Sequence, residues 1–401
     1  MKNKKTALQR FAATLSYIYR YFRRVFAKAL FRLIGFFTPH KGKLIVFDSM
    51  SGKQYSCNTR AIYEYMSAHC KDPDLRFVWA FREPERFARY ICDPRTIVVR
   101  YNSFAYFRFC SAADAVVFNF GWPFADRKNQ IRLQTWHGGG CYKKIGLAMN
   151  YNTSIRNWFS RSKMRDITHF VSSSRFFTDE VIRNQYNFHG EVLSVGMPRN
   201  DILVNGSDNA DELASIRKEL GIPDDRYVIL YAPTYDQMDP DNVETLDYEK
   251  IKQAAEERFG KTAIFLYRGH HYSEGPGTLH FDLNASDYPD MRDLLRITDM
   301  LITNYSSSIW DFSFTGRPCL LFAPDLEAYE KYRGFDKDIH TWGFPVCETN
   351  AALEEAILSF DESKFKAAMN KHHEDLGSYE SGSATRKICE FLAEKIGIET
   401  A

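Results

Sequence analysis

The sequence predicts an α/β protein in which two Rossmann-like domains face a cleft and a basic amphipathic helix precedes them. Three observations lead to this prediction. From Lys43 onward, short apolar segments alternate with amphipathic segments, which is the pattern of parallel strands separated by helices. A polar, acidic stretch around residues 205–212 interrupts this alternation, which then resumes. The first residues differ from both halves in charge and periodicity. We therefore divide the chain into residues 1–42, 43–205 and 206–401.

The segment 1–42 has the features of a helix that lies on a membrane surface. The first 43 residues hold eleven Lys or Arg and no Asp or Glu, and apolar residues recur at 3-4 spacing from Leu8 to Leu33. Five basic residues point to the other faces of this helix: Arg10, Arg20, Arg24, Lys28 and Arg32. No uncharged apolar run is long enough to span a bilayer, and the arginines interrupt any signal-peptide core. We expect a helix on an anionic membrane surface, with packing on the protein's own body as the alternative.

The remaining composition narrows the class of protein. Beyond the first 43 residues, the basic leader, the chain carries more acidic than basic residues, which argues against a general nucleic-acid binder. The eight cysteines show no C-x-x-C spacing and no close pairing with histidines, so they are typical of cytosolic thiols and not of a disulfide or zinc framework. No phosphate-loop, dinucleotide or zinc-protease motif occurs. We therefore expect neither a metal nor another cofactor.

The expected strands are short apolar segments in both halves. In the first domain they are 44–47, 77–81, 96–100, 115–120, 131–136 and 169–171, and in the second 227–232, 263–267, 301–303 and 319–322. Helices are expected between them, for example at 59–68 and 175–186. Ligands of open parallel sheets bind beyond the carboxyl ends of the strands, so the strand ends supply the site candidates.

Two candidates lie in the first domain. The strand at 131–136 runs into His137, which three glycines follow, and glycines allow a ligand to approach the backbone closely. A histidine there can titrate near neutral pH, and a purely structural histidine is the alternative. Arg199 lies in a Gly-Met-Pro-Arg-Asn-Asp turn at the expected domain junction. It is either a ligand contact or the partner of Asp201 in that turn.

The second domain holds a candidate anion site. The strand at 301–303 leads into Ser306, Ser307 and a helix that ends before Gly316, so hydroxyls and unpaired N–H groups meet at one point. The alternative is that Ser306 only caps the helix. Arg268 and His270 follow another strand two residues apart, and this pair suits a phosphate.

These segments together resemble the CDP-glycerol glycerophosphotransferase family, the teichoic acid primases and polymerases. The resemblance runs in order from about Leu133 to Phe335 through TWHGGGCYKKIG, GMPRNDIL, ILYAPTYD, YRGHH and ITNYSSSIWDFSFTGRPCLLFAPDLEAYEKYRGF. It implies a GT-B-type fold and an enzyme bound peripherally at the cytoplasmic face of the cell membrane. The implied reaction transfers glycerol phosphate, or a related polyol phosphate, from CDP-glycerol or another CDP-polyol to a hydroxyl of a lipid-linked acceptor. It releases CMP, in teichoic acid or capsular polymer synthesis.

The resemblance also implies roles for single residues. His137, in the Trp-His-Gly motif with Gly138, matches the proposed base, and His270 matches a histidine thought to contact the pyrophosphate. Ser306 and Ser307 match paired serines that hold donor phosphate. Four further residues fall at motif positions with substrate-binding roles: Arg199, Thr234, Arg268 and Asp311.

One motif departs from the family, and two other readings stay open. Many members continue Trp-His-Gly with Thr-Pro-Leu, whereas this chain has Gly139, Gly140 and Cys141, so the identity of the acceptor or polyol is open. A GT-B glycosyltransferase that uses a nucleotide sugar is one alternative. The other is a non-catalytic, membrane-bound scaffold of wall or capsule assembly.

Overall fold

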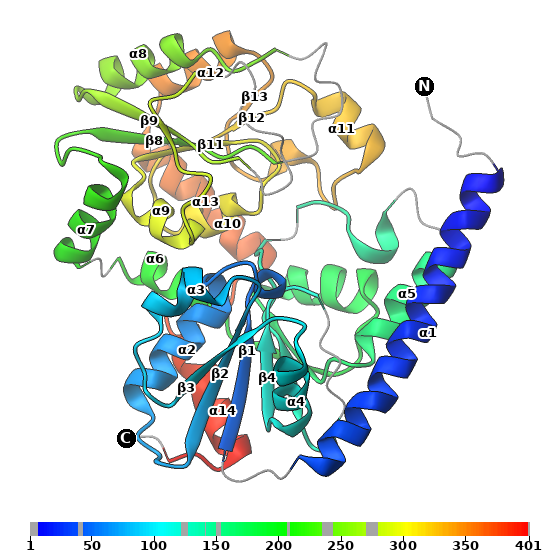
Figure 1. The fold of residues 1–401 in the computed structure, drawn as a ribbon. Coiled ribbons are helices and arrows are strands. Elements are labelled where there is room, and N and C mark those ends of the chain that lie inside the picture. Colours follow the sequence, from blue (N-terminus) through cyan, green and yellow to red (C-terminus); the bar gives the residue numbers. More distant parts are fainter. Residues whose placement is uncertain are drawn as a thin grey trace.

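The computed structural model describes residues 7–38, 43–121, 127–140, 142–149, 154–206, 209–234, 244–269 and 280–399. Two α/β domains, each built around a parallel sheet, lie one above the other (Figure 1). The carboxyl ends of both sheets point toward the region between the domains. The prediction of a GT-B-like α/β fold with two Rossmann-like domains facing a cleft is confirmed.

The sheet of the first domain has seven strands in the order β3-β2-β1-β4-β5-β6-β7, all parallel. Their bounds are β1 Lys43–Asp48, β2 Leu75–Phe81, β3 Thr96–Arg100, β4 Ala115–Phe118, β5 Ile131–Gln134, β6 His169–Ser172 and β7 Glu191–Ser194. Nearly every residue of β1, β2 and β4 is buried, as expected for a parallel sheet covered on both faces. All the predicted strands of this domain are present. The edge strand β7 was not predicted, because it has no apolar run.

The sheet of the second domain has six parallel strands in the order β10-β9-β8-β11-β12-β13. Their bounds are β8 Tyr227–Tyr231, β9 Ala263–Tyr267, β10 Leu283–Asn284, β11 Met300–Thr303, β12 Cys319–Phe322 and β13 Val346–Cys347. The four longer strands match the predicted segments, and β8, β11 and β12 are buried at every position. The sequence did not indicate β10 and β13, which have two residues each.

Helices connect the strands and cover the sheets. They are α1 Ala7–Phe37, α2 Cys57–His69, α3 Pro84–Phe87, α4 Phe104–Ala112, α5 Ser154–Met164, α6 Asp201–Asn205, α7 Ala210–Leu220, α8 Tyr248–Phe259, α9 Met291–Ile297, α10 Ser308–Ser313, α11 Leu326–Tyr332, α12 Asn350–Leu358, α13 Glu362–Leu376 and α14 Ala384–Ile396. The helix expected at 175–186 is present as a wider π-helix, Phe177–Gln185.

The last helix returns to the first domain. Ile388 and Leu392 of α14 are fully buried in the hydrophobic core of the first domain, where α14 packs against α2 (Figure 1). Asp201 anchors the start of α14, because its carboxylate accepts hydrogen bonds from the backbone N–H groups of Ala384 and Thr385. We expected the terminal helices to belong to the segment 206–401. The structure instead divides them between the domains.

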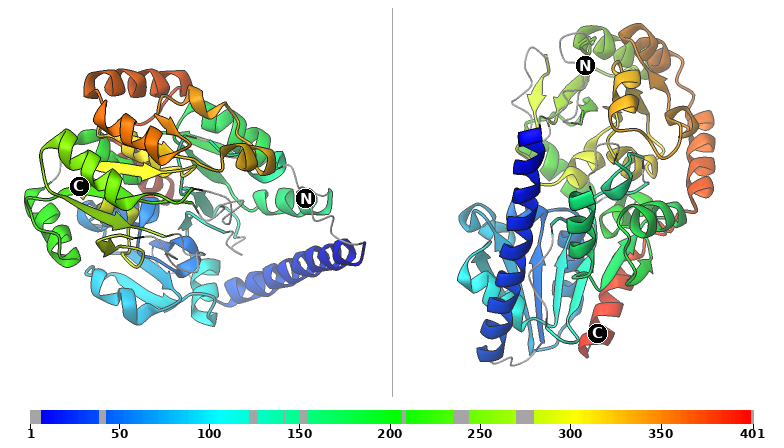
Figure 2. Two further views of the ribbon diagram at one scale, coloured as in Figure 1. Left: turned by 90° about the horizontal axis from the view of Figure 1, so that it is seen from above. Right: turned by 90° about the vertical axis from the view of Figure 1, so that its right-hand side faces the viewer.

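One face of the leader helix α1 packs on the first domain. The helix runs along one side of that domain, against α4 and α5 (Figures 1 and 2). Arg24 and Lys28 both form ion pairs with Asp166, a buried residue that follows α5. Phe31 is buried and stacks on Phe107 of α4, with ring centroids 4.2 Å apart. This face of α1 therefore packs on the protein's own body, which the sequence analysis gave as the alternative to membrane contact.

The opposite face of α1 exposes large apolar side chains. They are Leu15, Ile18, Tyr19, Phe22, Val25, Phe26, Leu30, Leu33, Phe36 and Phe37. No helix among the described residues is long and apolar enough to cross a bilayer. The amphipathic helix predicted from the sequence thus directs two of its basic residues inward, together with Phe31, and most of its large apolar side chains outward.

Candidate active site

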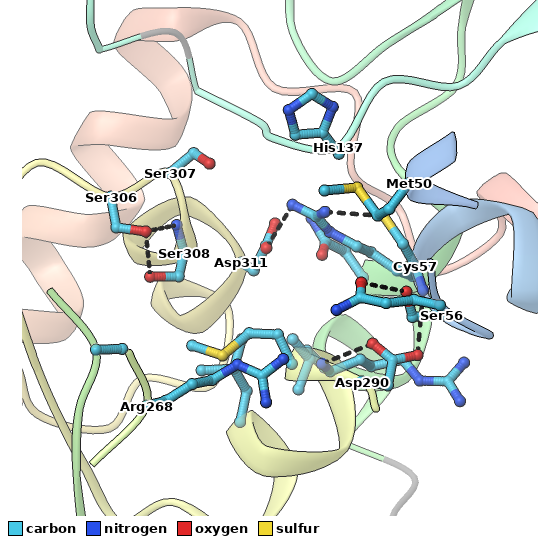
Figure 3. A pocket seen from close by; sticks show the side chains of 18 of the residues that line it. Met50, Ser56, Cys57, His137, Arg268, Asp290, Ser306, Ser307, Ser308 and Asp311 are labelled. Atoms are coloured by element: carbon cyan, nitrogen blue, oxygen red, sulfur yellow. Dashed lines mark hydrogen bonds and ion pairs between the residues drawn. The ribbon is translucent and has the colours of Figure 1, made fainter. Parts of the chain in front are cut away.

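A cavity lies between the two domains, where the carboxyl ends of both sheets meet (Figure 3). Six of the residues singled out in the sequence line it, from both domains: His137, Arg199, Arg268, Ser306, Ser307 and Asp311. In Figure 3 the serines lie on one side of the cavity and Met50, Ser56 and Cys57 on the other. The cavity therefore joins residues that are as far apart in the chain as 50 and 311.

His137 enters the cavity from the loop after β5. Its Nδ1 lies 2.9 Å from the backbone oxygen of Asn119. Because a carbonyl oxygen only accepts hydrogen bonds, Nδ1 carries the proton, and Nε2 is the ring nitrogen that can take up another. The preceding residue, Trp136, has a φ of 58°, a left-handed conformation that is costly for a residue with a Cβ. The loop thus holds the histidine in one tautomer and one orientation.

The glycines after His137 lie directly against the turn of the second domain that contains Ser306 and Ser307, which we call the serine turn. A Cβ atom at Gly138 would come within 2.6 Å of the Ser307 Oγ, and one at Gly139 would overlap the ring of Trp310. Side chains at these two positions would push the domains apart. Glycine is therefore required at position 139 beside Trp310, which explains why threonine does not follow Trp-His-Gly in this chain.

The two serines differ in their contacts. The Oγ of Ser306 accepts hydrogen bonds from the backbone N–H of Ser308 (3.3 Å) and from its hydroxyl (3.0 Å), so the capping alternative holds in part for Ser306. Ser307 occupies the N-cap position of α10, but its side chain forms no capping hydrogen bond. Since α10 has only six residues, we attribute any phosphate contact to the hydroxyl groups and not to the helix dipole.

Arg199 and Asp311, which both line the cavity, form an ion pair between the domains. Arg199 Nη2 donates to Asp311 Oδ2 at 2.6 Å, and Nη1 lies 3.1 Å from the Cys57 sulfur. Burial opposes the charge of Arg199, but Asp311 raises the pKa of the guanidinium well above its ordinary value. Burial raises the pKa of Asp311, and the ion pair opposes that rise. The alternative in which Arg199 pairs with Asp201 does not occur, because the Asp201 carboxylate accepts hydrogen bonds from the backbone of Ala384 and Thr385.

Arg268 lies across the cavity from His137 in Figure 3. Its Nη1 donates to the backbone oxygens of Ala285 (3.2 Å) and Tyr288 (2.9 Å), which fixes the side chain. Burial lowers its pKa to about 10, so the guanidinium stays charged at neutral pH. Thr234 lies close by, where its backbone N–H donates to Asn304 Oδ1 at 2.8 Å, but it is not among the lining residues. His270 lies outside the described residues.

Two lining segments were not predicted. The loop after β1 contributes Met50, Gln54 and Ser56, the first residue of α2 contributes Cys57, and the N-cap of α9 contributes Asp290. Asp290 Oδ2 accepts from the backbone N–H of Cys57 at 3.1 Å, which ties the two segments together. Met50 and Cys57 have φ values of 49° and 67°, strained conformations that accumulate at functional sites. The rule that ligands bind beyond the strand ends, applied to β1, indicates this loop.

The described residues contain no group of three or more His, Cys, Asp or Glu side chains placed to hold a metal ion. The seven cysteines within the described part of the chain are free thiols.

Comparisons with known proteins agree with this geometry. Residues 30–394 match the family described as CDP-Glycerol:Poly(glycerophosphate) glycerophosphotransferase. The chain is 30% identical over 371 residues to the teichoic acid poly(glycerol phosphate) polymerase of Bacillus subtilis (strain 168). The aligned residues cover 87% of this chain and 48% of that protein. The chain is 29% identical over 379 residues to the teichoic acid glycerol-phosphate transferase of Staphylococcus aureus (strain NCTC 8325 / PS 47), covering 88% and 93%.

A solved structure extends the comparison to the fold. The wall teichoic acid polymerase TagF superimposes with a TM-score of 0.77 at 26% identity, over 96% of this chain and 98% of that chain. A variant of that polymerase has also been solved after a soak with CDPG. The chain spans about half the length of the first curated relatives that it matches.

Proposed function

We propose, because the chain belongs to the CDP-Glycerol:Poly(glycerophosphate) glycerophosphotransferase family, that it transfers glycerol phosphate from CDP-glycerol to a hydroxyl of a lipid-linked acceptor. A related CDP-polyol is the other possible donor of the same class. CMP is the second product, and the acceptor polymer is a teichoic acid or a capsular polymer. The observation that carries the proposal is the cavity, where His137 of one domain faces the hydroxyls of Ser306 and Ser307 and the charge of Arg268 from the other.

The reaction is a displacement at the β-phosphorus of the donor. The acceptor oxygen forms a bond to this phosphorus, and the bond to the bridging oxygen breaks, so CMP departs with that oxygen. The acceptor proton passes to His137 Nε2, because Nδ1 already donates to the Asn119 carbonyl. Phosphoryl transfer relies mainly on positioning and on stabilisation of the developing charge. General-base assistance adds about 10²–10⁴-fold.

Charge stabilisation falls to the second domain in this mechanism. Arg268 stays protonated at neutral pH, since its pKa is about 10, and faces the cavity. It neutralises charge on the departing CMP together with the hydroxyls of Ser306 and Ser307. We assign the pyrophosphate contact of His270 by its motif alone. Thr234 and Asp311 are proposed substrate-binding residues, and Asp311 acts by holding Arg199 in place.

The two domains divide the substrates between them. We propose that residues 43–205, with His137 and the loop after β1, receive the acceptor. The segment from 206 binds the CDP-polyol through Arg268 and the serine turn. Gly138 allows the two halves to approach, because it lies against Ser307.

We further propose that α1 holds the enzyme at the cytoplasmic face of the cell membrane. A lipid-linked acceptor lies in the membrane, so the cavity must stay near its surface. The helix combines exposed aromatic side chains on its outward face, such as Phe22 and Phe26, with basic residues that are exposed elsewhere on its surface, such as Arg20 and Arg23. This combination suits the interface of an anionic bilayer.

A donor panel tests the proposed function. The purified full chain is incubated with a synthetic lipid-linked disaccharide acceptor and with CDP-glycerol, CDP-ribitol or UDP-sugars, and release of CMP or UDP is followed. Acceptor-dependent CMP release from a CDP-polyol is expected, and the two CDP-polyols distinguish the polyol. UDP release would instead support a glycosyltransferase. No nucleotide release with any donor would support a scaffold and refute the proposal.

A further inference from the structure

The carboxyl group of Glu380 connects three segments next to the cavity. Its Oε1 accepts hydrogen bonds from Trp310 Nε1 (3.0 Å) and Asn200 Nδ2 (3.1 Å), and its Oε2 accepts one from the backbone N–H of Met197 (2.9 Å). Glu380 is not among the residues that line the cavity. It therefore holds other groups in place and does not touch the substrate.

Glu380 belongs structurally to the first domain, although it follows the helices of the second. The backbone N–H of Tyr379 donates to Ser173 O at 2.8 Å, just beyond β6. Gly382 O accepts a hydrogen bond from Asn205 Nδ2 at 2.9 Å, and α14 begins two residues later. The segment around Glu380 is thus fixed to the first domain on both sides.

Trp310 belongs to the second domain and packs against the loop after β5 that carries His137, which we call the His137 loop. It lies in α10, four residues after Ser306, and is fully buried. Its ring is so close to Gly139 that a Cβ atom at Gly139 would overlap it. The hydrogen bond from Trp310 to Glu380 therefore fixes the ring that supports the His137 loop.

We propose that Glu380 is a positioning residue that acts through Trp310 to set the His137 loop at its working distance from the serine turn. This inference rests on the proposed function, in which His137 accepts the proton and the serines hold the donor. Displacing a base by as little as 1 Å lowers turnover by up to about 10²-fold. Donor binding depends on Arg268 and the serines, which Glu380 does not contact.

The test separates turnover from donor affinity with matched variants. Glu380→Ala removes the acceptor of the Trp310 N–H. Glu380→Gln keeps an acceptor oxygen for Trp310 at almost the same size, and its amide nitrogen replaces only the oxygen that accepts from the Met197 N–H. Trp310→Phe removes the donor and keeps an aromatic ring. We expect kcat for CMP release to fall about 10- to 100-fold in E380A and W310F. We expect a dissociation constant for CDP-glycerol within about threefold of wild type, a change below about 0.7 kcal/mol. E380Q should keep most of the activity.

A double variant tests whether Glu380 acts through Trp310. If it does, E380A/W310F should be no slower than the slower single variant, because both remove the same hydrogen bond. Losses that multiply in the double variant would overturn the proposal. So would an E380Q that is as impaired as E380A, or a parallel loss of donor affinity and kcat.

Two further measurements cover misfolding and failure of the proposed function. Gly139→Ala displaces the same loop without any change at Glu380, and should lower kcat while donor affinity is kept. The rate at which diethyl pyrocarbonate modifies His137, followed by peptide mass spectrometry, needs no donor. It should rise in E380A and W310F but not in E380Q. Wild-type rates in both variants would refute the positioning role even if the enzyme used a different donor. Absence of CMP release from the wild type would refute only the proposed function.

Discussion

Phe22 and Phe26 provide the sharpest test of membrane contact by α1. Their side chains are 63% and 72% exposed and lie on the outward face of the helix. Deleting the helix is a poorer test, because it also removes Arg24 and Lys28 and leaves the buried Asp166 without these two cations. Leaving a buried charge unpaired destabilises a protein whether or not it binds a membrane. Phe22→Ser with Phe26→Ser avoids this problem.

The structure sets the size of the expected effect. Fully burying a Phe side chain is worth about 1.5–3 kcal/mol, so a side chain that is about two-thirds exposed has roughly 1–2 kcal/mol left to gain in the membrane. The two side chains together contribute about 2–4 kcal/mol, and the double substitution should weaken membrane partitioning at least roughly 30-fold. Folding should be little affected, since neither side chain is buried in the protein.

The assay is sedimentation with vesicles that contain anionic lipid, at low salt. Leu358→Ser is the matched control, because Leu358 is 38% exposed at the end of α12 in the other domain. Wild type and L358S should sediment with the vesicles, and F22S/F26S should remain in the supernatant. Sedimentation of F22S/F26S at the wild-type level, or an equal loss in L358S, would refute membrane contact by this face.

Three other predictions concern the cavity and the fold. Ser306→Ala with Ser307→Ala should weaken CDP-glycerol binding at least about tenfold without unfolding, at about 1.5–3 kcal/mol for each hydrogen bond to a charged group. Unchanged affinity in a donor titration would show that neither serine holds the donor and would leave Ser306 only its local contacts with Ser308. His137→Ala should lower kcat by about 10²–10⁴-fold with nearly unchanged donor affinity, and the reverse pattern in the same assays would make His137 a binding residue. Burial lowers the pKa of His372 to about 3 and that of His373 to about 4, so both are neutral in the fold. Because unfolded histidines titrate near pH 6.5, their contribution to stability should be complete above about pH 6.5 and lost as the pH falls toward 4, by at most about 1.4 kcal/mol per pH unit for each. His372→Gln with His373→Gln should reduce this slope in urea unfolding, and an unchanged slope would contradict the assignment.

The sequence was informative where the chemistry of single segments determines the structure. Fully buried strands such as β8 and β11 consist of apolar residues, so their positions could be read directly. The edge strand β7 has exposed residues at both ends, Glu191 and Ser194, and therefore lacks that signal. The strands β10 and β13 are too short to produce a pattern.

The site residues show the same limit. His137, Arg268 and Ser307 lie in the segments just after β5, β9 and β11, and their types suit phosphate chemistry, so they could be predicted. Met50 and Cys57 also follow a strand, but neither residue type indicates a ligand by itself. Glu380 offers no local signal at all, because its role depends on a hydrogen bond to Trp310, 70 positions away in the chain.

Helix α10 explains why the two halves of the site can work together. It begins with the serine turn of the second domain, and two adjacent residues connect it to the first. Trp310 donates to Glu380 at 3.0 Å, and Asp311 accepts from Arg199 at 2.6 Å. In the proposed mechanism, the base on one domain and the donor bound to the other react only if the distance between them is fixed, and the interdomain cavity by itself does not fix it. The two contacts of α10 do so directly at the serine turn, within one turn of Ser307. The small residues Gly138 and Gly139 allow the His137 loop to meet that helix without an intervening side chain. We therefore expect substitutions at these contacts to alter turnover more than the affinity for either substrate.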